Sequence, residues 1–302
     1  MSSFSGVWAA SVTPLHDDLS VNHDKFAAHV QWLLSHGCDG VAVFGSTGEA
    51  NSFSIQERVD ALDALALSGV EMGRLVVGTG ACAVADGVAL SRHAVDAGCA
   101  GVLITPPFYY KGVTDDGIFA FFSQLVAGVD RPGRLRIVLY HFPRLVAVGF
   151  SEELIARLVA QWPSEIAAVK DSSGDLERMK RLVLAHPSMG VFTGNEKLLL
   201  DLLAAGGAGC LTASANLTSA LAAAVVASRS PADQARLTAH REALSAAPFV
   251  AGLKQLLFER SGDSGWLNVR PPHQRLSSAA AGELRAAVER AVSVAGGVPN
   301  WG

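Results

Sequence analysis

Residues 166–175 have the sequence Ile-Ala-Ala-Val-Lys-Asp-Ser-Ser-Gly-Asp, and this stretch decides how the rest of the chain is interpreted. An apolar run of strand length ends at Lys170, and a turn rich in serine and glycine follows at once. In α/β enzymes, reacting groups lie at strand ends of this kind. Most lysines at strand ends are simply solvated, so Lys170 becomes a candidate catalytic residue only if the rest of the chain supports the same fold.

One pattern recurs eight times along the chain: a short apolar strand, a loop and an amphipathic helix. The predicted strands cover residues 7–12, 41–44, 75–77, 101–104, 136–140, 166–170, 190–193 and 209–211. They are apolar throughout rather than alternating, as a buried parallel sheet requires. Eight strand–helix units, about 25–30 residues apart, predict an α/β fold of the (β/α)8 or TIM-barrel type.

The strands stop near residue 230, and three helical segments follow at residues 232–245, 249–259 and 278–294. No low-complexity linker separates them from the preceding units. The sequence therefore predicts a catalytic barrel over residues 1–230 and a C-terminal helical region over residues 231–302 that packs on the barrel.

Composition excludes several classes of protein. The chain has 302 residues, half of them hydrophobic, which is enough for a large core. Its formal net charge is −4 and no basic run occurs, so we expect no nucleic-acid partner. Apolar stretches are interrupted before about 18 residues, which argues against a membrane span. The N-terminus does not resemble a signal peptide and the four cysteines form no CxxC pair, so we expect a cytoplasmic location.

Four loops would bring reactive side chains to one mouth of such a barrel. They carry Ser46 and Thr47 after the second strand, Tyr109 and Tyr110 after the fourth, Tyr140 on the fifth and Lys170 on the sixth. Because burial disfavours the ammonium form, a desolvated lysine can supply an amine that attacks a ketone and forms a Schiff base. A neighbouring phenol can carry protons. Hydroxyl and backbone N–H groups between glycines can bind a carboxylate.

Each of these features also has a structural interpretation. Residues 45–49 lack the ending of a phosphate-binding loop and can be a tight turn. Tyr140 can be a packed residue with a satisfied hydroxyl, and Tyr109 and Tyr110 can form a subunit contact. His141 is interpreted as a hydrogen-bonded structural group. No His, Asp or Glu residues have metal-ligand spacing, so we expect no metal.

Taken together, six motifs resemble the dihydrodipicolinate synthase/N-acetylneuraminate lyase family of pyruvate-type class I aldolases. The motifs are Gly6 with Thr13-Pro14, Gly-Ser-Thr-Gly-Glu at 45–49, Thr-Pro-Pro-Phe-Tyr-Tyr at 105–110, Tyr140 with Pro143, Val-Lys-Asp-Ser-Ser-Gly-Asp at 169–175, and Gly-Asn-Glu at 194–196. The resemblance extends over essentially the whole barrel. It implies a lyase that forms a Schiff base with pyruvate or another 2-oxo acid, needs no cofactor, and assembles as a homotetramer built from two dimers.

The resemblance also implies roles for individual residues. Lys170 matches the Schiff-base lysine, and Tyr140 matches the tyrosine that carries protons. Thr47 matches the hydroxyl that links this tyrosine to a second one, and Ser46 and Thr47 match the site for the pyruvate carboxylate. In the family the second tyrosine comes from a neighbouring subunit; Tyr110 fits that role best, with Tyr109 as the alternative.

Several positions depart from the family pattern. Dihydrodipicolinate synthases carry a substrate-binding arginine where this chain has Leu145, although Arg144 stands one place earlier. Gly194 and Glu196 match a substrate-binding stretch in which sialate lyases have two acids, and here Glu196 alone keeps an acid. His141 replaces a common asparagine.

These departures favour a lyase acting on a 2-oxo-3-deoxy or 4-hydroxy-2-oxo acid over a 4-hydroxy-tetrahydrodipicolinate synthase, which joins pyruvate and aspartate semialdehyde. A 2-oxo-3-deoxy sugar acid dehydratase, which shares the imine and differs in the bond that it breaks, is an open alternative. A non-catalytic sensor of small molecules is a further alternative. It is disfavoured because both Lys170 and Tyr140 are present.

Overall fold

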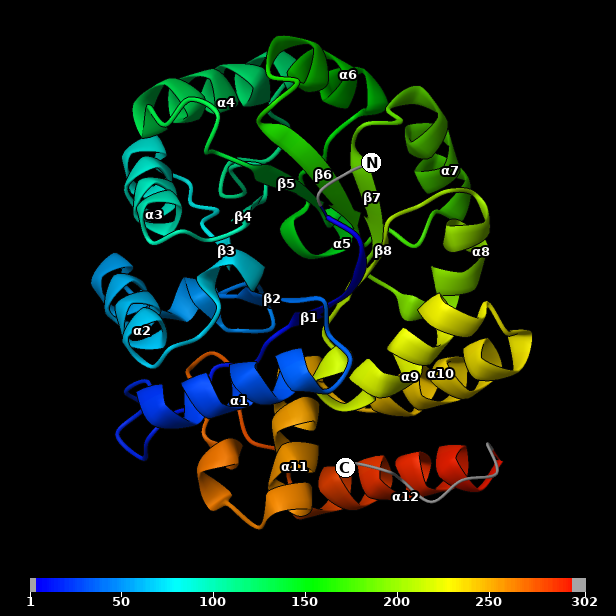
Figure 1. Cartoon of the computed structure of the whole chain (residues 1–302). Helices are drawn as coiled ribbons and strands as arrows, with labels where there is room; N and C mark the ends of the chain where they lie inside the picture. The colour runs from blue at the N-terminus through cyan, green and yellow to red at the C-terminus, as the bar shows by residue number, and fades with distance from the viewer. Residues whose placement is uncertain (1–3, 295–302) are drawn as a thin grey trace.

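The computed structural model describes residues 4–294 and contains a closed barrel of eight parallel strands, in which β1 pairs with β8 (Figure 1). The predicted TIM-barrel fold is confirmed, and the strand ends differ from the prediction by no more than two residues. The strands are β1 Gly6–Ala10, β2 Gly40–Val43, β3 Leu75–Gly78, β4 Gly101–Ile104, β5 Ile137–His141, β6 Ile166–Asp171, β7 Gly190–Thr193 and β8 Gly209–Thr212.

Helices surround the barrel and begin where capping residues predict. Ser54 and Glu57 form a reciprocal capping box, and the hydroxyls of Thr114 and Ser151 accept from the first turns of their helices. The helices of the ring are α1 His23–Ser35, α2 Ile55–Leu67, α3 Val84–Asp96, α4 Asp115–Val129, α5 Pro143–Val146, α6 Glu152–Gln161, α7 Leu176–Ala185, α8 Leu199–Ala204 and α9 Ala215–Ser228. Short 3-10 turns are η1 Ala50–Ser52, η2 Met72–Arg74, η3 Glu196–Leu198 and η4 Ser264–Leu267.

Two helical details differ from the sequence prediction. The short helix α5 was not predicted, and the helical stretch between β7 and β8, which the repeating pattern predicts as one helix, is divided into η3 and α8. A four-residue helix is too short to show a helical period, although Pro143 occupies its first turn, where proline is favoured.

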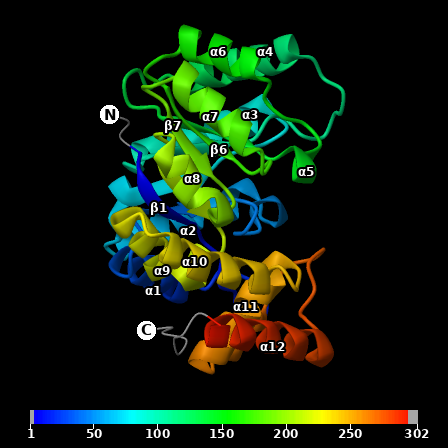
Figure 2. The same ribbon diagram turned by 90° about the vertical axis from the view of Figure 1, so that its right-hand side faces the viewer.

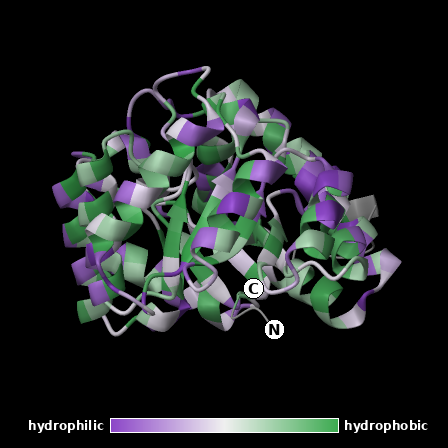
Figure 3. Ribbon diagram, turned by 90° about the horizontal axis from the view of Figure 1, so that it is seen from above, coloured by the Kyte–Doolittle hydropathy of each residue, from purple (hydrophilic) through white to green (hydrophobic). Residues whose placement is uncertain are grey.

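The barrel interior is filled by side chains that alternate with those facing the helices. Trp8, Val76 and Phe192 belong to the inner cluster, whereas Val169 belongs to the shell between strands and helices. In the view from above, the strands are mostly hydrophobic and most hydrophilic residues lie on the surrounding helices and loops (Figure 3). At the closure of the barrel, a Cβ on Gly209 would lie 2.0 Å from the carbonyl oxygen of Gly6, so only glycine fits there.

The C-terminal helices are α10 Pro231–Leu244, α11 Phe249–Ser261 and α12 Ser278–Val294. They lie outside the ring, beside α1 and α9, and Figure 2 places them on the opposite side of the barrel from α4 and α6. Their apolar residues form one cluster with Val12 and Leu217 of the barrel, so the two regions share a core. The division at residue 230 stays a prediction. Within residues 4–294, no helix has the length and apolar character that crossing a membrane demands.

Candidate active site

Lys170 and Tyr140 lie side by side on neighbouring strands. The register of β5 and β6 pairs these two residues, and the lysine Nζ lies 4.0 Å from the centroid of the tyrosine ring. Each residue is 5% exposed. Among residues 4–294, no carboxylate forms an ion pair with Lys170. An amine next to a phenol in a nearly closed site is the arrangement that carbonyl addition with proton transfer requires.

A cavity of about 460 Å³ opens above this pair at the carboxyl ends of the strands. Its size is that of small-molecule sites. Most of the predicted site residues contribute to its wall, namely Ser46, Thr47, Tyr140, Leu145, Lys170 and Gly194. The structure therefore gathers residues from β2, β5, β6 and β7 around one space.

The loop that carries Ser46 and Thr47 is anchored on both sides. Thr13 donates its hydroxyl to the carbonyl of Gly48 at 2.8 Å, which explains why Thr13 accompanies this loop in the motif pattern. Glu49 has a left-handed backbone with φ of 58° and a buried carboxylate. This carboxylate accepts from the ammonium of Lys254 and, at 2.7 Å, from the backbone N–H of Arg270. The C-terminal region thus fixes the loop predicted to bind the substrate carboxylate.

Asp171, next to Lys170, faces away from the cavity and holds the following turn. Its carboxylate accepts from the backbone N–H of Ser173 at 2.8 Å and from Nε of Arg178 at 3.0 Å. His141 lies in the same layer, and its Nδ1 accepts from the backbone N–H of Phe150 at 3.0 Å. Burial lowers the pKa of His141. The structural interpretation of His141 therefore agrees with its position.

Glu196 does not line the cavity, although the motif pattern assigned it to substrate binding. Its side chain is fully buried and accepts from the hydroxyls of Thr212, at 2.7 Å, and Ser214. Oε2 also lies 3.7 Å from Nε of Arg241. Burial raises the pKa of Glu196. In this chain the carboxylate connects the end of β7 to β8 and α10, and a direct contact with substrate stays a prediction.

Tyr109 and Tyr110 lie away from the cavity in the single chain. Each is 73% exposed, and their rings meet edge to face at 5.1 Å. Neither lines the space above Lys170. Large exposed aromatic side chains are enriched in protein contacts. Entry of one of the two tyrosines into a neighbouring subunit stays a prediction.

The C-terminal region supplies part of the wall, which the sequence interpretation missed. Arg241, Phe249 and His273 line the cavity together with Lys170. Two residues of α5, Arg144 and Leu145, also line the cavity, so a substrate can contact either side chain. The missed residues lie far from the barrel motifs in sequence, and no local pattern marks them.

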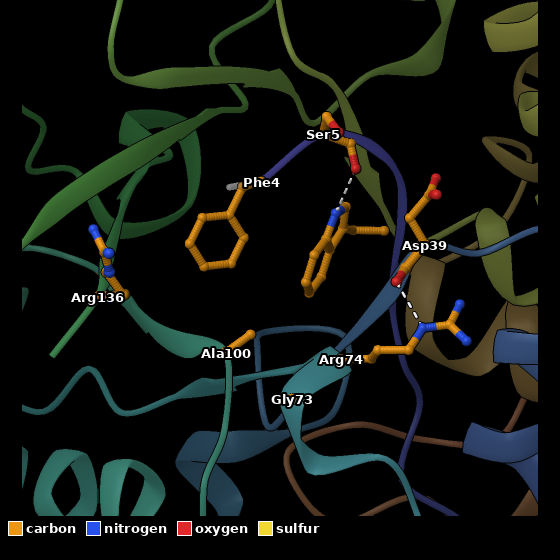
Figure 4. Close-up of a pocket in the computed structure, with 8 residues that line it drawn as sticks. Phe4, Ser5, Asp39, Gly73, Arg74, Ala100 and Arg136 are labelled. Carbon is orange, nitrogen blue, oxygen red and sulfur yellow. Dashed lines mark hydrogen bonds between the residues drawn. The ribbon is translucent and has the colours of Figure 1, made fainter. Parts of the chain in front are cut away.

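A second cavity, of about 500 Å³, lies at the opposite end of the barrel (Figure 4). Its residues precede the strands: Phe4 comes before β1, Asp39 before β2 and Arg74 before β3. Arg74 donates through Nε to the carbonyl of Asp39 at 3.0 Å. In barrels of this type the amino ends of the strands serve stability rather than catalysis, so the active site is assigned to the carboxyl ends.

Comparison with known proteins agrees with this geometry. The model of the Dihydrodipicolinate synthetase family matches residues 3–291. A relative from Chloroflexus aurantiacus, described as an uncharacterized DapA-like lyase, is 34% identical over 291 residues, covering 94% of this chain and 96% of that protein. The dihydrodipicolinate synthase structure from Agrobacterium tumefaciens has a TM-score of 0.89 and 31% identity, covering 94% of this chain and 98% of that one. The pyruvate complex of YagE from E. coli has a TM-score of 0.87 at 22% identity, covering 96% and 99%.

Proposed function

The chain belongs to the dihydrodipicolinate synthetase family, a family of class I aldolases and lyases, and we propose that it cleaves or forms a 2-oxo acid through a Schiff base on Lys170. The observation that carries the proposal is the buried lysine against Tyr140, in a cavity that Ser46 and Thr47 also line. Pyruvate is the expected 2-oxo product or substrate, and an aldehyde is its partner.

The proposed cleavage proceeds in balanced steps. The amine of Lys170 adds to C2 of the 2-oxo acid, and the carbinolamine loses water to form an imine. Tyr140 donates its phenolic proton to the departing water, which leaves a protonated imine, and the resulting phenolate then accepts the proton of the C4 hydroxyl. The C3–C4 bond breaks, the electron pair of that bond enters the protonated imine to give an enamine, and the aldehyde leaves. Protonation at C3 and addition of water then release pyruvate and the free amine. Ser46 and Thr47 hold the carboxylate during these steps.

Leu145 favours a substrate that differs from aspartate semialdehyde. It lines the cavity where synthases of the family place an arginine, and leucine offers a carboxylate no hydrogen bond. We therefore propose that the physiological substrate is a 2-oxo-3-deoxy or 4-hydroxy-2-oxo acid. The second candidate is 4-hydroxy-tetrahydrodipicolinate synthase activity, the function named for a relative from Agrobacterium fabrum that is 29% identical. Arg144 on the same wall favours this candidate.

The proposed assembly is a homotetramer in which Tyr110 enters the site of a neighbour. Its exposed position in the single chain supports this role. Tetrameric assembly and a cytoplasmic location both stay predictions from the sequence.

Trapping of the imine tests the proposed function directly. The protein is incubated with pyruvate, reduced with borohydride, digested and examined by mass spectrometry. A reduced pyruvate adduct on the peptide that contains Lys170 is expected. An adduct on another residue, or none, would refute the mechanism.

A substrate comparison separates the candidate activities. kcat/KM is measured for condensation of pyruvate with aspartate semialdehyde and for conversion of several 4-hydroxy-2-oxo and 2-oxo-3-deoxy acids, with product analysis to distinguish cleavage from dehydration. We expect cleavage to dominate. A wide preference for aspartate semialdehyde that disappears in Arg144→Ala would instead identify the synthase.

A further inference from the structure

Arg241 brings a cation from the C-terminal region to the wall of the catalytic cavity. It lies on α10 and lines the same space as Lys170. The helix is fixed to the barrel there, because Gln234 donates to the carbonyl of Glu196 at 3.0 Å and accepts from the backbone N–H of Leu200 at 3.0 Å. Arg241 is therefore held in place by its helix.

The guanidinium of Arg241 has donors that the described chain does not use. Nη1 is buried and has no hydrogen-bond partner among residues 4–294. Nε lies 3.7 Å from Oε2 of Glu196, beyond hydrogen-bond distance, and that carboxylate already accepts from two hydroxyls. A buried donor without a partner destabilises a protein. Because Arg241 as a whole lines the cavity, a ligand carboxylate that pairs with its guanidinium would supply an acceptor that the described chain does not.

The orientation of the guanidinium suits a planar anion. Its Cζ lies 4.1 Å from the centroid of the Phe249 ring, which restricts its movement. A planar guanidinium offers parallel N–H groups that match the two oxygens of a carboxylate. Arg144 on the same wall adds a second positive charge to the cavity. An anionic ligand group is therefore better matched to this part of the wall than a neutral one.

We propose that Arg241 binds a carboxylate at the far end of the substrate, so that the preferred substrates are 2-oxo acids with a second carboxylate. The proposal rests on the proposed function, since Lys170 is taken to bind C2 and Ser46 and Thr47 the first carboxylate. The cation comes from α10, whereas the synthases use the loop after β5. Leu145 then contacts the chain between the two carboxylates.

Matched pairs of 2-oxo acids test the proposal without requiring turnover. Imine formation at Lys170 is trapped with borohydride and quantified against concentration for 2-oxoglutarate and 2-oxopentanoate, and for 2-oxoadipate and 2-oxohexanoate. Each pair differs only in a terminal carboxylate. In the wild-type chain, the dicarboxylate of at least one pair is expected to half-saturate at a concentration about 10- to 100-fold lower, the scale of a charged hydrogen bond.

Two variants and one control assign the effect to Arg241. Arg241→Gln should reduce the preference to about twofold or less, and Arg241→Lys should keep part of it. Arg144→Gln, which removes the second arginine of the wall, should keep most of it. Thermal unfolding of each variant shows whether it folds, and the ratio of half-saturating concentrations within each pair cancels any general effect of a variant on imine formation.

The outcomes distinguish the two proposals. An unchanged preference in Arg241→Gln, or no preference in the wild-type chain while pyruvate is trapped normally, would refute the role of Arg241 alone. Failure of the wild-type chain to form any adduct on Lys170 would refute the proposed function and this proposal with it.

Discussion

Replacing Lys254 by methionine should weaken both the fold and the site. Lys254 lies on α11, is 1% exposed, and donates to the carboxylate of Glu49 and, at 2.7 Å, to the carbonyl of Asn268. Burial lowers the pKa of Lys254, although the charge of Glu49 opposes that shift. Methionine fills much of the volume but leaves a buried carboxylate without its cation. Breaking a buried pair in this way costs about 3–5 kcal/mol in the free energy of unfolding.

The assay is denaturation by guanidinium chloride, followed by kcat/KM at a temperature where the variant is folded. Lys197→Met is the matched control, because its pair with Glu242 is largely exposed and should contribute less than about 1 kcal/mol. Displacement of the loop that carries Ser46 and Thr47 should reduce kcat/KM by about 10-fold or more. The double variant Lys254→Met/Glu49→Gln removes the orphaned charge, so it should recover at least half of the lost stability.

Two results would contradict this reasoning. If Lys254→Met cost no more stability than Lys197→Met, the buried pair would not hold the loop. Glu49→Gln is measured alone as well. If the double variant lost as much free energy of unfolding as Lys254→Met and Glu49→Gln lose in sum, the two side chains would act independently.

Three further predictions use other parts of the structure. Lys170→Ala should remove essentially all turnover, because no other lysine among residues 4–294 lines the cavity and could form the imine; residual activity above about 1% of wild type would contradict this. Tyr110→Phe should lower kcat by about 10²-fold without changing stability, and full activity in a stable monomer, measured by sedimentation, would argue against a shared site. Burial lowers the pKa of His29 from 6.5 to about 4, so the unfolded chain binds a proton there that the folded chain does not. Stability should therefore fall by about 2 kcal/mol between pH 7 and pH 5, a loss that His29→Gln should lack when unfolding is measured at both pH values.

The barrel could be predicted from sequence because its strands are buried on both sides. Continuous apolar runs followed by capping residues mark each unit, as at Ser54 and Thr114. Tyr140 and Lys170 could be placed together because parallel strands present their carboxyl ends on one side. The observed strand and helix ends differ from the predicted ends by a residue or two, because the last residues of an element depend on tertiary hydrogen bonds.

The position of Glu196 and the contribution of Arg241 could not be predicted. Motif spacing assigned Glu196 to the substrate, but its carboxylate turns toward Thr212 and Ser214, which are far from it in sequence. Arg241 follows an ordinary amphipathic pattern on α10, and only the packing of that helix against η3 brings its guanidinium to the cavity. Side-chain direction at a loop end depends on partners that the local sequence does not reveal.

The C-terminal helices are therefore better understood as part of the candidate active site than as an appendage to the barrel. A helical region that served only stability would present its apolar side to the barrel and its charges to water. Here Lys254 and the backbone N–H of Arg270 donate to the carboxylate of Glu49, at the end of the loop that carries Ser46. Arg241 lines the cavity that also contains Lys170. In the proposed mechanism the barrel strands supply the reacting groups, and the C-terminal helices line the part of the cavity beyond them. Differences in substrate among proteins with this barrel can then arise in α10 and α11 without any change at Lys170.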